Sequence, residues 1–458
     1  MKAICSLLLT LLGSVVSLSA QTQSPITEKV DQYLTAAHQA DRFNGVVLVT
    51  YQGQVVLHKA YGVRNAATKA PNDTATRFPL LSITKSFTAA LFLKLQEQGN
   101  LSVNDKLSQY FPDFPKGDSI TLHHLLTHTS GLFNYTELID EADSALVCHP
   151  VPKQRIVELI RDKPLAFPPG KQFSYCNSGY FLLGLVIEKV TGKPYEQSMR
   201  ELIFQPLGMN HSGFDFINLP IPLRAIGYDT LTTDYYSPYP HPDSTVLYAA
   251  GGIYSTTGDM LQWARAIAKG QLLSANSWKM AFTPQLNGYG YGWHNDQFGG
   301  KPYLRHSGGY PGFMSEFVYY PKEDLTLILF NNFGNYADSV FPVVQSLSVI
   351  VFGMPDDLWL PGQAIVLEEK LLKQYIGRYV ADQPSDYGTD IVLRAGRLYS
   401  LGHHKNQLPE LALYASSPDH FFPEKYNSRV SFRRDASGQV VSCIIQENGQ
   451  RFEWKKVD

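Results

Sequence analysis

Four strand-like segments stand in two pairs at opposite ends of the stretch from residue 26 to residue 352. The pairs are 45–50 with 54–57, and 313–320 with 325–331. A short turn joins the members of each pair, so each pair is predicted to form a β-hairpin. Helix patterns, among them 82–98, 178–191 and 257–269, fill the chain between the pairs. This order predicts an α+β fold in which distant segments build one antiparallel sheet flanked by helices.

The pattern changes after residue 352. Residues 353–368 contain Gly, Pro and Asp clusters and are predicted to be a linker between a domain at 21–352 and another at 369–458. In the second domain, short strand patterns recur between the turn signals Ala395-Gly396, Ser437-Gly438 and Asn448-Gly449. Regular short strands with glycine turns predict a small all-β, barrel-like domain.

Composition excludes several classes of protein. The length of 458 residues favours two or more domains. The hydrophobic content of 44% excludes a wholly disordered chain. With 39 Lys and Arg against 41 Asp and Glu, the formal net charge is −2. We therefore expect no nucleic-acid partner, because the chain has no general excess of basic residues.

The first twenty residues have the pattern of a secretory signal peptide. Lys2 precedes a mostly apolar run at 4–16, and small residues lead to Ala20, after which cleavage is expected. No later segment has the length needed to cross a bilayer. The sequence thus predicts an exported protein, periplasmic or secreted, with no stable membrane span.

Ser82 and Lys85 lie three residues apart at the start of an apolar helix pattern. At that spacing they share one helix face. A lone ammonium in a buried helix is costly unless it has partners or loses its proton. Either outcome suits Ser82 as a nucleophile and Lys85 as its partner in proton transfer. The alternative is a surface lysine that extends outward beside an ordinary serine.

Two later segments carry further candidates. Tyr175 and Asn177 are two residues apart before a helix pattern, so both side chains can face one cleft. A phenol near a lysine is a credible general base, and an amide can bind both Lys85 and a substrate carbonyl. The alternative is an Asx-type helix entry beside a buried tyrosine.

The segment from Arg305 to Gly312 contains the run His306-Ser307-Gly308-Gly309. Its glycines would let a ligand approach the backbone of an edge strand that lines a cleft. Arg305 should point to the opposite face of that strand. The alternative is a glycine-rich loop with a surface histidine.

These three motifs together resemble those of the serine β-lactamase and penicillin-binding-protein superfamily. The Tyr-x-Asn form is most similar to the class C β-lactamase branch, which includes esterases, DD-peptidases and D-amino-acid peptidases. The stretches 125–132 and 250–255 strengthen the resemblance, which covers roughly residues 26–350. It implies a β-lactamase-like sheet with a helical subdomain. The C-terminal portion resembles the lipocalin-like β-domains appended to some members.

The resemblance implies an acyl-enzyme mechanism. Ser82 attacks a carbonyl, Lys85 and Tyr175 manage its proton, and Asn177 and His306 complete the catalytic set. The backbone N–H groups of Ser82 and Gly309 form the oxyanion hole, and Ser307 and Gly308 contact the substrate. The expected substrate is a small ester or amide, or a peptide containing D-amino acids, cell-wall-derived peptides among them. Which of Lys85 and Tyr175 is the formal base stays open, as does the oligomeric state.

The third motif departs from the common pattern because it begins with His306 where lysine is usual. A histidine is mostly neutral at pH 7, which puts binding of a β-lactam or of a peptide carboxylate in doubt. The other function class is a catalytically silent ligand-binding or sensor protein that retains the fold. Cys176, between Tyr175 and Asn177, is expected to be buried packing.

No cofactor or metal is expected. The chain has no CxxC pair, no HExxH, no Walker A loop and no Rossmann glycine fingerprint. His124 and His128 have the spacing of metal ligands on a helix, but the Thr-Ser-Gly that follows resembles a structural turn of the family. No metal-binding residue is therefore assigned.

Overall fold

The structure is a computed structural model of the chain. It describes residues 25–141, 148–232, 234–334, 340–354, 364–381, 388–403, 410–423, 428–447 and 450–457. The predicted signal peptide, most of the predicted linker and the Asn448-Gly449 turn lie outside the described residues. Within the described residues, no helix has the length and apolar character required to cross a bilayer.

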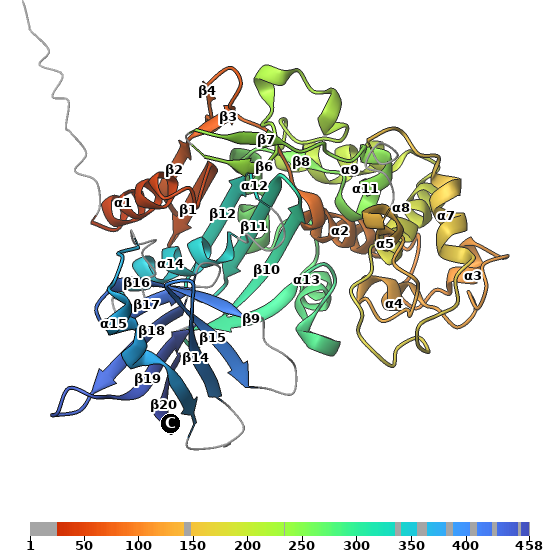
Figure 1. The fold of residues 1–458 in the computed structure, drawn as a ribbon. Helices are drawn as coiled ribbons and strands as arrows, with labels where there is room; N and C mark the ends of the chain where they lie inside the picture. The colour runs from red at the N-terminus through yellow and green to blue at the C-terminus, as the bar shows by residue number, and fades with distance from the viewer. Residues whose placement is uncertain are drawn as a thin grey trace, which may run out of the picture.

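One six-stranded antiparallel sheet forms the centre of the larger domain (Figure 1). Its order is β2-β1-β12-β11-β10-β9. The strands are β1 (Gly45–Tyr51), β2 (Gln54–Tyr61), β9 (His294–Phe298), β10 (Lys301–Tyr310), β11 (Phe313–Tyr320) and β12 (Leu325–Asn331). The two predicted hairpins meet where β1 pairs with β12, from Gly45 opposite Asn331 to Tyr51 opposite Leu325. The predicted sheet of distant segments is confirmed.

Helices cover both faces of this sheet. β11 and β12 are buried along their whole length, so side chains on both faces need cover. α1 (Pro25–Gln39) and α14 (Phe341–Phe352) pack on one face with Val47, Val318 and Leu327. The other face, with Leu48, Phe317 and Ile328, adjoins a larger helical core. The principal helices of that core are α2 (Thr84–Glu97), α8 (Asn177–Thr191), α11 (Ser244–Gly251) and α12 (Thr257–Ala268).

Shorter elements complete the larger domain. The helices are η1 (Leu81–Ile83), α3 (Leu107–Tyr110), α4 (Leu122–Leu126), α5 (Thr136–Glu141), α7 (Lys153–Arg161), α9 (Tyr195–Met199), η2 (Arg200–Phe204), α10 (Gln205–Leu207), η3 (Phe216–Asn218), η4 (Ile221–Leu223), α13 (Ala275–Phe282) and η5 (Leu286–Gly288). The strands are β3 (Val63–Asn65), β4 (Ala70–Pro71), β5 (Phe78–Pro79), β6 (Tyr228–Leu231), β7 (Tyr236–Pro238) and β8 (Tyr254–Ser255). Several of these helices surround α2 and α8 and form the predicted helical subdomain.

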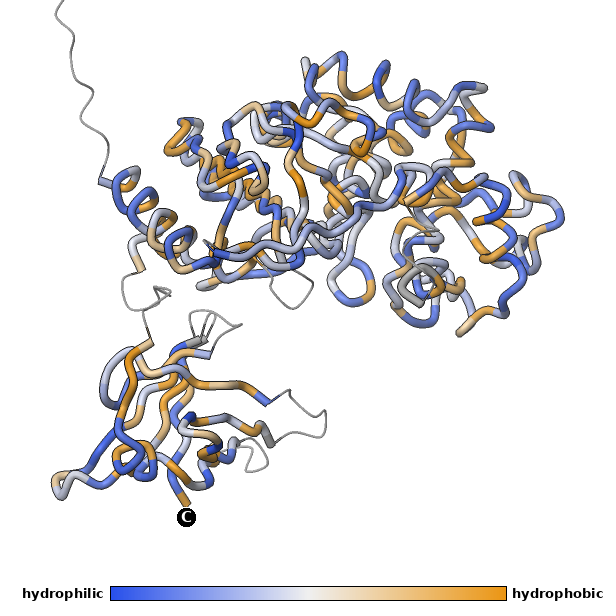
Figure 2. The backbone as a smooth tube through the Cα atoms, turned by 45° about the horizontal axis from the view of Figure 1, so that its top comes forward, coloured by the Kyte–Doolittle hydropathy of each residue, from blue (hydrophilic) through white to orange (hydrophobic). Residues whose placement is uncertain are grey.

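The C-terminal region forms a closed eight-stranded antiparallel barrel, as the short strand patterns predict. Hydrophobic and hydrophilic stretches alternate along its chain (Figure 2). α15 (Glu369–Leu372) and η7 (Lys373–Tyr375) precede the strands. The strands are β13 (Gly377–Val380), β14 (Gly388–Arg394), β15 (Arg397–His403), β16 (Leu411–Ser417), β17 (His420–Pro423), β18 (Ser428–Arg434), β19 (Val440–Glu447) and β20 (Gln450–Lys456). Tyr375, Phe421 and Phe432 pack against one another in a core separate from the two cores of the larger domain.

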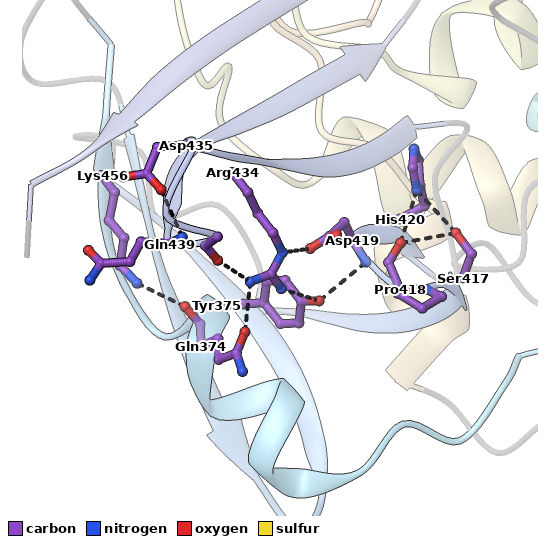
Figure 3. A network of polar contacts seen from close by, with 11 residues as sticks. Gln374, Tyr375, Ser417, Pro418, Asp419, His420, Arg434, Asp435, Gln439 and Lys456 are labelled. Atoms are coloured by element: carbon purple, nitrogen blue, oxygen red, sulfur yellow. Dashed lines mark hydrogen bonds and ion pairs between the residues drawn. The ribbon is translucent and has the colours of Figure 1, made fainter.

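A polar network ties the helical entry of the barrel to its strands (Figure 3). The Arg434 guanidinium donates hydrogen bonds to Asp419 at 2.8 Å, to the Gln374 side chain at 2.7 Å and to the Tyr375 hydroxyl at 3.1 Å. It also donates to the Gly438 carbonyl at 2.8 Å. One side chain of β18 thereby joins η7, the turn before β17 and the turn after β18.

Candidate active site

Ser82 lies in a strained turn before the first buried helix. The sequence predicts an α-helix from residue 82, whereas the structure has the 3₁₀ turn Leu81–Ile83 followed by α2 from Thr84. Leu81, directly before Ser82, has φ = 51°, a conformation that costs free energy for a non-glycine residue. Such strain is typical of functional sites, and here it coincides with the predicted nucleophile.

Lys85 is fully buried one turn further on, beneath Ser82. Its Nζ donates hydrogen bonds to Ser82 Oγ at 2.9 Å, to Asn177 Oδ1 at 2.7 Å and to the Ala250 carbonyl at 2.8 Å. An ammonium has three donors, so all three are used. No Asp or Glu in the described part of the chain forms an ion pair with it. Burial therefore lowers the pKa of Lys85 well below its usual value.

The acceptors around Lys85 are themselves held in place. The Asn177 amide donates to the Thr136 hydroxyl at 3.0 Å, which orients its carbonyl oxygen toward Lys85. The Ala250 carbonyl comes from α11, whose helical path is interrupted at Tyr248, with φ = 41° and ψ = −132°. Because of that interruption, the carbonyls that follow it turn toward α2, where Ala249 accepts from Thr88 and Ala250 accepts from Lys85.

Tyr175 lies beside this group, just before α8. Its ring centroid is 4.9 Å from Lys85 Nζ and 6.3 Å from the His306 ring. The next residue, Cys176, is buried against the carbonyls of Leu132 and Phe133, which confirms that it is packing. Tyr175 and Asn177 thus face the lysine, as their spacing predicts.

His306 is buried on β10, and both of its ring nitrogens have partners. Nδ1 is 2.7 Å from the Ser307 carbonyl, and Nε2 is 3.0 Å from the Tyr289 hydroxyl. Burial, with the nearby His294 and Lys85, lowers its pKa well below the usual value. His306 is therefore neutral at pH 7 and does not provide the permanent cation that a lysine would provide there.

Gly308 allows β10 to approach the turn that carries Ser82. A Cβ atom on Gly308 would lie 2.1 Å from the Leu80 carbonyl oxygen and 2.9 Å from Leu81 Cβ. The sequence predicts that this glycine makes room for a ligand. The structure shows that the missing side chain also makes room for the backbone just before Ser82, while Gly308 lines the cavity.

A cavity of about 420 Å³ joins the predicted residues. Ser82, Tyr175, Asn177, His306, Ser307, Gly308 and Gly309 all line it. Lys85 lies behind them and is reached through Ser82 and Asn177. Arg305 packs with its guanidinium 4.5 Å from the Phe341 ring of α14, on the other face of the sheet, as alternation along a strand predicts.

Three side chains near the site were not predicted from the sequence. They are His128 and Tyr289, whose rings lie beside that of Tyr175, and His294, whose ring lies beside Tyr289. The His128 ring is 4.3 Å from the Tyr175 ring and 4.6 Å from the Tyr289 ring. His294, at the start of β9, lines the cavity and lies 5.4 Å from the His306 ring. Burial lowers the pKa of His128 well below its usual value and that of His294 to about 4. His128 belongs to the stretch 125–132 that resembles the family, which is the one signal that could have found it.

His124 and His128 each use Nδ1 in a hydrogen bond with a backbone N–H group. His124 Nδ1 accepts a hydrogen bond from the Thr121 backbone in a capping box at the start of α4. His128 Nδ1 accepts from the Cys176 backbone at 3.1 Å. Among the described residues, no group of three or more His, Cys, Asp or Glu side chains could hold a metal ion.

Comparisons with known proteins identify the family of this chain. Residues 29–341 match the model of the Beta-lactamase family. Penicillin-binding protein 4* of Bacillus subtilis is 30% identical over 90% of this chain and 94% of its own length. The putative penicillin-binding protein PbpX of the same organism is 32% identical over 68% of this chain and 75% of its own.

Solved structures share the fold. The octameric penicillin-binding protein homologue from Pyrococcus abyssi superposes with a TM-score of 0.67 at 24% identity, over 94% of this chain and 99% of its own. D-amino acid amidase from Ochrobactrum anthropi gives a TM-score of 0.62 at 23% identity, over 72% and 98%. The chain is a serine hydrolase that belongs to the β-lactamase and penicillin-binding-protein family.

Proposed function

We propose that this protein hydrolyses a small ester, an amide or a peptide containing D-amino acids through an acyl-enzyme on Ser82. The observation that carries the proposal is the contact between Lys85 Nζ and Ser82 Oγ at 2.9 Å, in a buried site where the other acceptors are neutral. The relatives named as penicillin-binding proteins and as a D-amino acid amidase support this substrate range.

The first half of the reaction forms the acyl-enzyme. Neutral Lys85 accepts the Ser82 proton as Oγ attacks the substrate carbonyl, and the carbonyl oxygen gains the negative charge. The backbone N–H groups of Ser82 and Gly309 are the proposed donors to that oxygen. Collapse of the tetrahedral species breaks the bond to the leaving group, which receives the proton through Lys85 or Tyr175. The positions of Tyr175 and Asn177 beside Lys85 suit this relay.

The second half releases the acid. Water attacks the ester on Ser82, and Tyr175 is the proposed base: it takes a proton from that water as its own phenol proton passes to Lys85. Lys85 then gives this proton to Ser82 Oγ as the ester bond to the acyl group breaks, which leaves both side chains neutral again. Because Tyr175 lies in the cavity beside both Lys85 and His306, one side chain can serve both halves.

The run that begins with His306 bears on which substrates the site prefers. Neutral, hydrogen-bonded His306 does not offer a charge to a carboxylate at the position where a lysine is usual. We therefore propose readier turnover of esters and uncharged amides than of β-lactams.

The signal-peptide pattern of the first twenty residues supports an exported protein, periplasmic or secreted. Cell-wall-derived peptides are among the substrates proposed for an exported enzyme of this kind. The octameric relative leaves the oligomeric state of this chain open. Fractionation of a host that expresses the whole chain, followed by mass spectrometry of its N-terminus, tests export. A mature chain that begins at Gln21 is the expected result.

A fluorophosphonate adduct tests the enzymatic proposal. Mass spectrometry should place it on Ser82, and Ser82→Ala should lack it. A panel of p-nitrophenyl esters, nitrocefin and D-amino-acid peptides should show esterase activity and little nitrocefin turnover. Absence of both an adduct and any turnover would instead favour a silent binding or sensor protein.

A further inference from the structure

The cavity continues past the catalytic residues to the other face of the sheet. β9 pairs with β10 only as far as Arg305 opposite His294, so within the described residues Ser307–Tyr310 have a strand partner on one side alone. Glu316, in the middle of β11, also lines the cavity. Because β11 is paired on both sides, only the side chain of Glu316 can reach that space.

Glu316 lies on the face opposite the helical core that holds Ser82. It stands directly across from Ser307, and its neighbours Met314 and Val318 on the same face pack in the core beside α14. Gly308, next to Ser307, touches the turn of the nucleophile. Glu316 therefore lies opposite Ser307, and the next residue of β10, Gly308, contacts the turn that carries Ser82.

The Glu316 carboxyl is buried without a hydrogen bond at one of its oxygens. Its residue is 3% exposed, and Oε2 has no partner among the described residues. Arg305, the cation whose charge acts on Glu316, stacks on Phe341 and lies 3.9 Å from Asp296. A buried acceptor without a donor is costly, and a carboxylate without a donor more so. Burial accordingly raises the pKa of Glu316 to about 7, although the Arg305 charge lowers it.

We propose that Glu316 is a recognition site for a primary ammonium group on the substrate. This proposal deepens the proposed function, because it rests on one cavity serving both Ser82 and Glu316. A primary ammonium has three donors and a positive charge. It can therefore supply both the hydrogen-bond donor and the compensating charge that the buried Glu316 carboxylate lacks. The absence of side chains on Gly308 and Gly309 leaves the β10 edge open for a substrate to extend from the nucleophile to the carboxyl.

Competitive inhibition tests the site with benzylammonium and benzyl alcohol as probes and p-nitrophenyl acetate as the uncharged substrate. At pH 8 the amine is protonated and Glu316 is mostly ionised, given its pKa of about 7. A charge-assisted hydrogen bond predicts an inhibition constant for benzylammonium lower than that for benzyl alcohol by about tenfold or more. Glu316→Gln should remove this ratio. Glu323→Gln, a glutamate paired with Lys301 away from the cavity, should leave it unchanged.

Arg305→Met distinguishes two roles of Glu316: binding of the ammonium probe, and a purely structural interaction with Arg305. Recognition predicts an equal or larger ratio, because a competing positive charge is removed. A ratio lost equally in Glu316→Gln and Arg305→Met, or equal inhibition by both probes in the wild-type protein, would overturn the proposal. Calorimetric titration of Ser82→Ala with benzylammonium needs no turnover. It therefore shows whether the ammonium site survives even if the proposed hydrolysis does not.

Discussion

Two cations, the fully buried Lys85 of the larger domain and the half-buried Arg434 of the barrel, have opposite surroundings. Lys85 in the larger domain donates to a hydroxyl, an amide and a backbone carbonyl, and burial lowers its pKa. Arg434 in the barrel also loses solvation, but hydrogen bonds with Tyr375 and Asp419 raise its pKa overall. A carboxylate partner stabilises a positive charge, whereas burial without a carboxylate partner favours the neutral amine. Arg434 therefore ties parts of the barrel together, and Lys85 is available for proton transfer.

The largest expected difference between the two cations is in turnover. Lys85→Met should lower kcat for p-nitrophenyl acetate by about 10²–10⁴-fold, because it removes the proposed proton acceptor of Ser82. Arg434→Met should leave kcat near the wild-type value, since its partners all belong to the barrel. Steady-state kinetics of the two variants measures the contrast. Similar losses in both would show that the domains are not functionally separate.

A second contrast compares glycines of the two domains. Gly308→Ala puts a Cβ atom into the Leu80 carbonyl and shifts the turn that carries Ser82. A displacement near 1 Å predicts a loss of about 10²-fold in kcat/KM. Gly396 in the barrel has φ = 75° but open space around it, so Gly396→Ala should strain the backbone without affecting turnover. Full activity of Gly308→Ala would refute the close contact.

The pH dependence sharpens the contrast between Lys85 and the histidines near it. Lysine must be neutral to accept the Ser82 proton, so kcat/KM should rise with pH through the lowered pKa of Lys85. Burial lowers the pKa of His306, so the imidazole stays neutral over this range. His306→Gln should change the rate but not the midpoint of the rise. A midpoint that moves with His306→Gln would assign the titration to the histidine.

The smallest effect on activity is expected from the carboxylate partner of Arg434. Asp419→Asn should lower the unfolding free energy of the barrel by about 1–3 kcal/mol, since it weakens a charge-assisted hydrogen bond. It should leave ester hydrolysis unchanged. Thermal unfolding and the p-nitrophenyl acetate assay check the two parts, and a loss of activity without a loss of stability would contradict the structural role of Arg434.

Local patterns account for what could be predicted from the sequence. The strand-like segments around one turn give the bounds of β11 and β12, and the three-residue spacing puts Ser82 and Lys85 on one face. The pair Tyr175 and Asn177 also faces the lysine. Each of these depends on neighbours within a few residues, which periodicity can resolve.

The features of the site that could not be predicted from the sequence depend on backbone angles and on contacts between segments that are distant in the chain. The Ala250 carbonyl reaches Lys85 because the chain is non-helical at Tyr248, a conformation that composition does not specify. His128 and His294 meet at Tyr289 from separate elements. The contact of Gly308 with Leu80 could not be predicted either, because sequence alone does not show which chain faces a glycine.

The proton affinity of Lys85 can be measured directly by an NMR titration of the wild-type protein with ¹³C at lysine Cε, assigned with Lys85→Arg. The buried site with neutral acceptors predicts that the Lys85 signal titrates well below the range of the exposed lysines, in step with the rise of kcat/KM. A Lys85 signal that titrates with the exposed lysines, near pH 10.5, would contradict its role as the proton acceptor of Ser82.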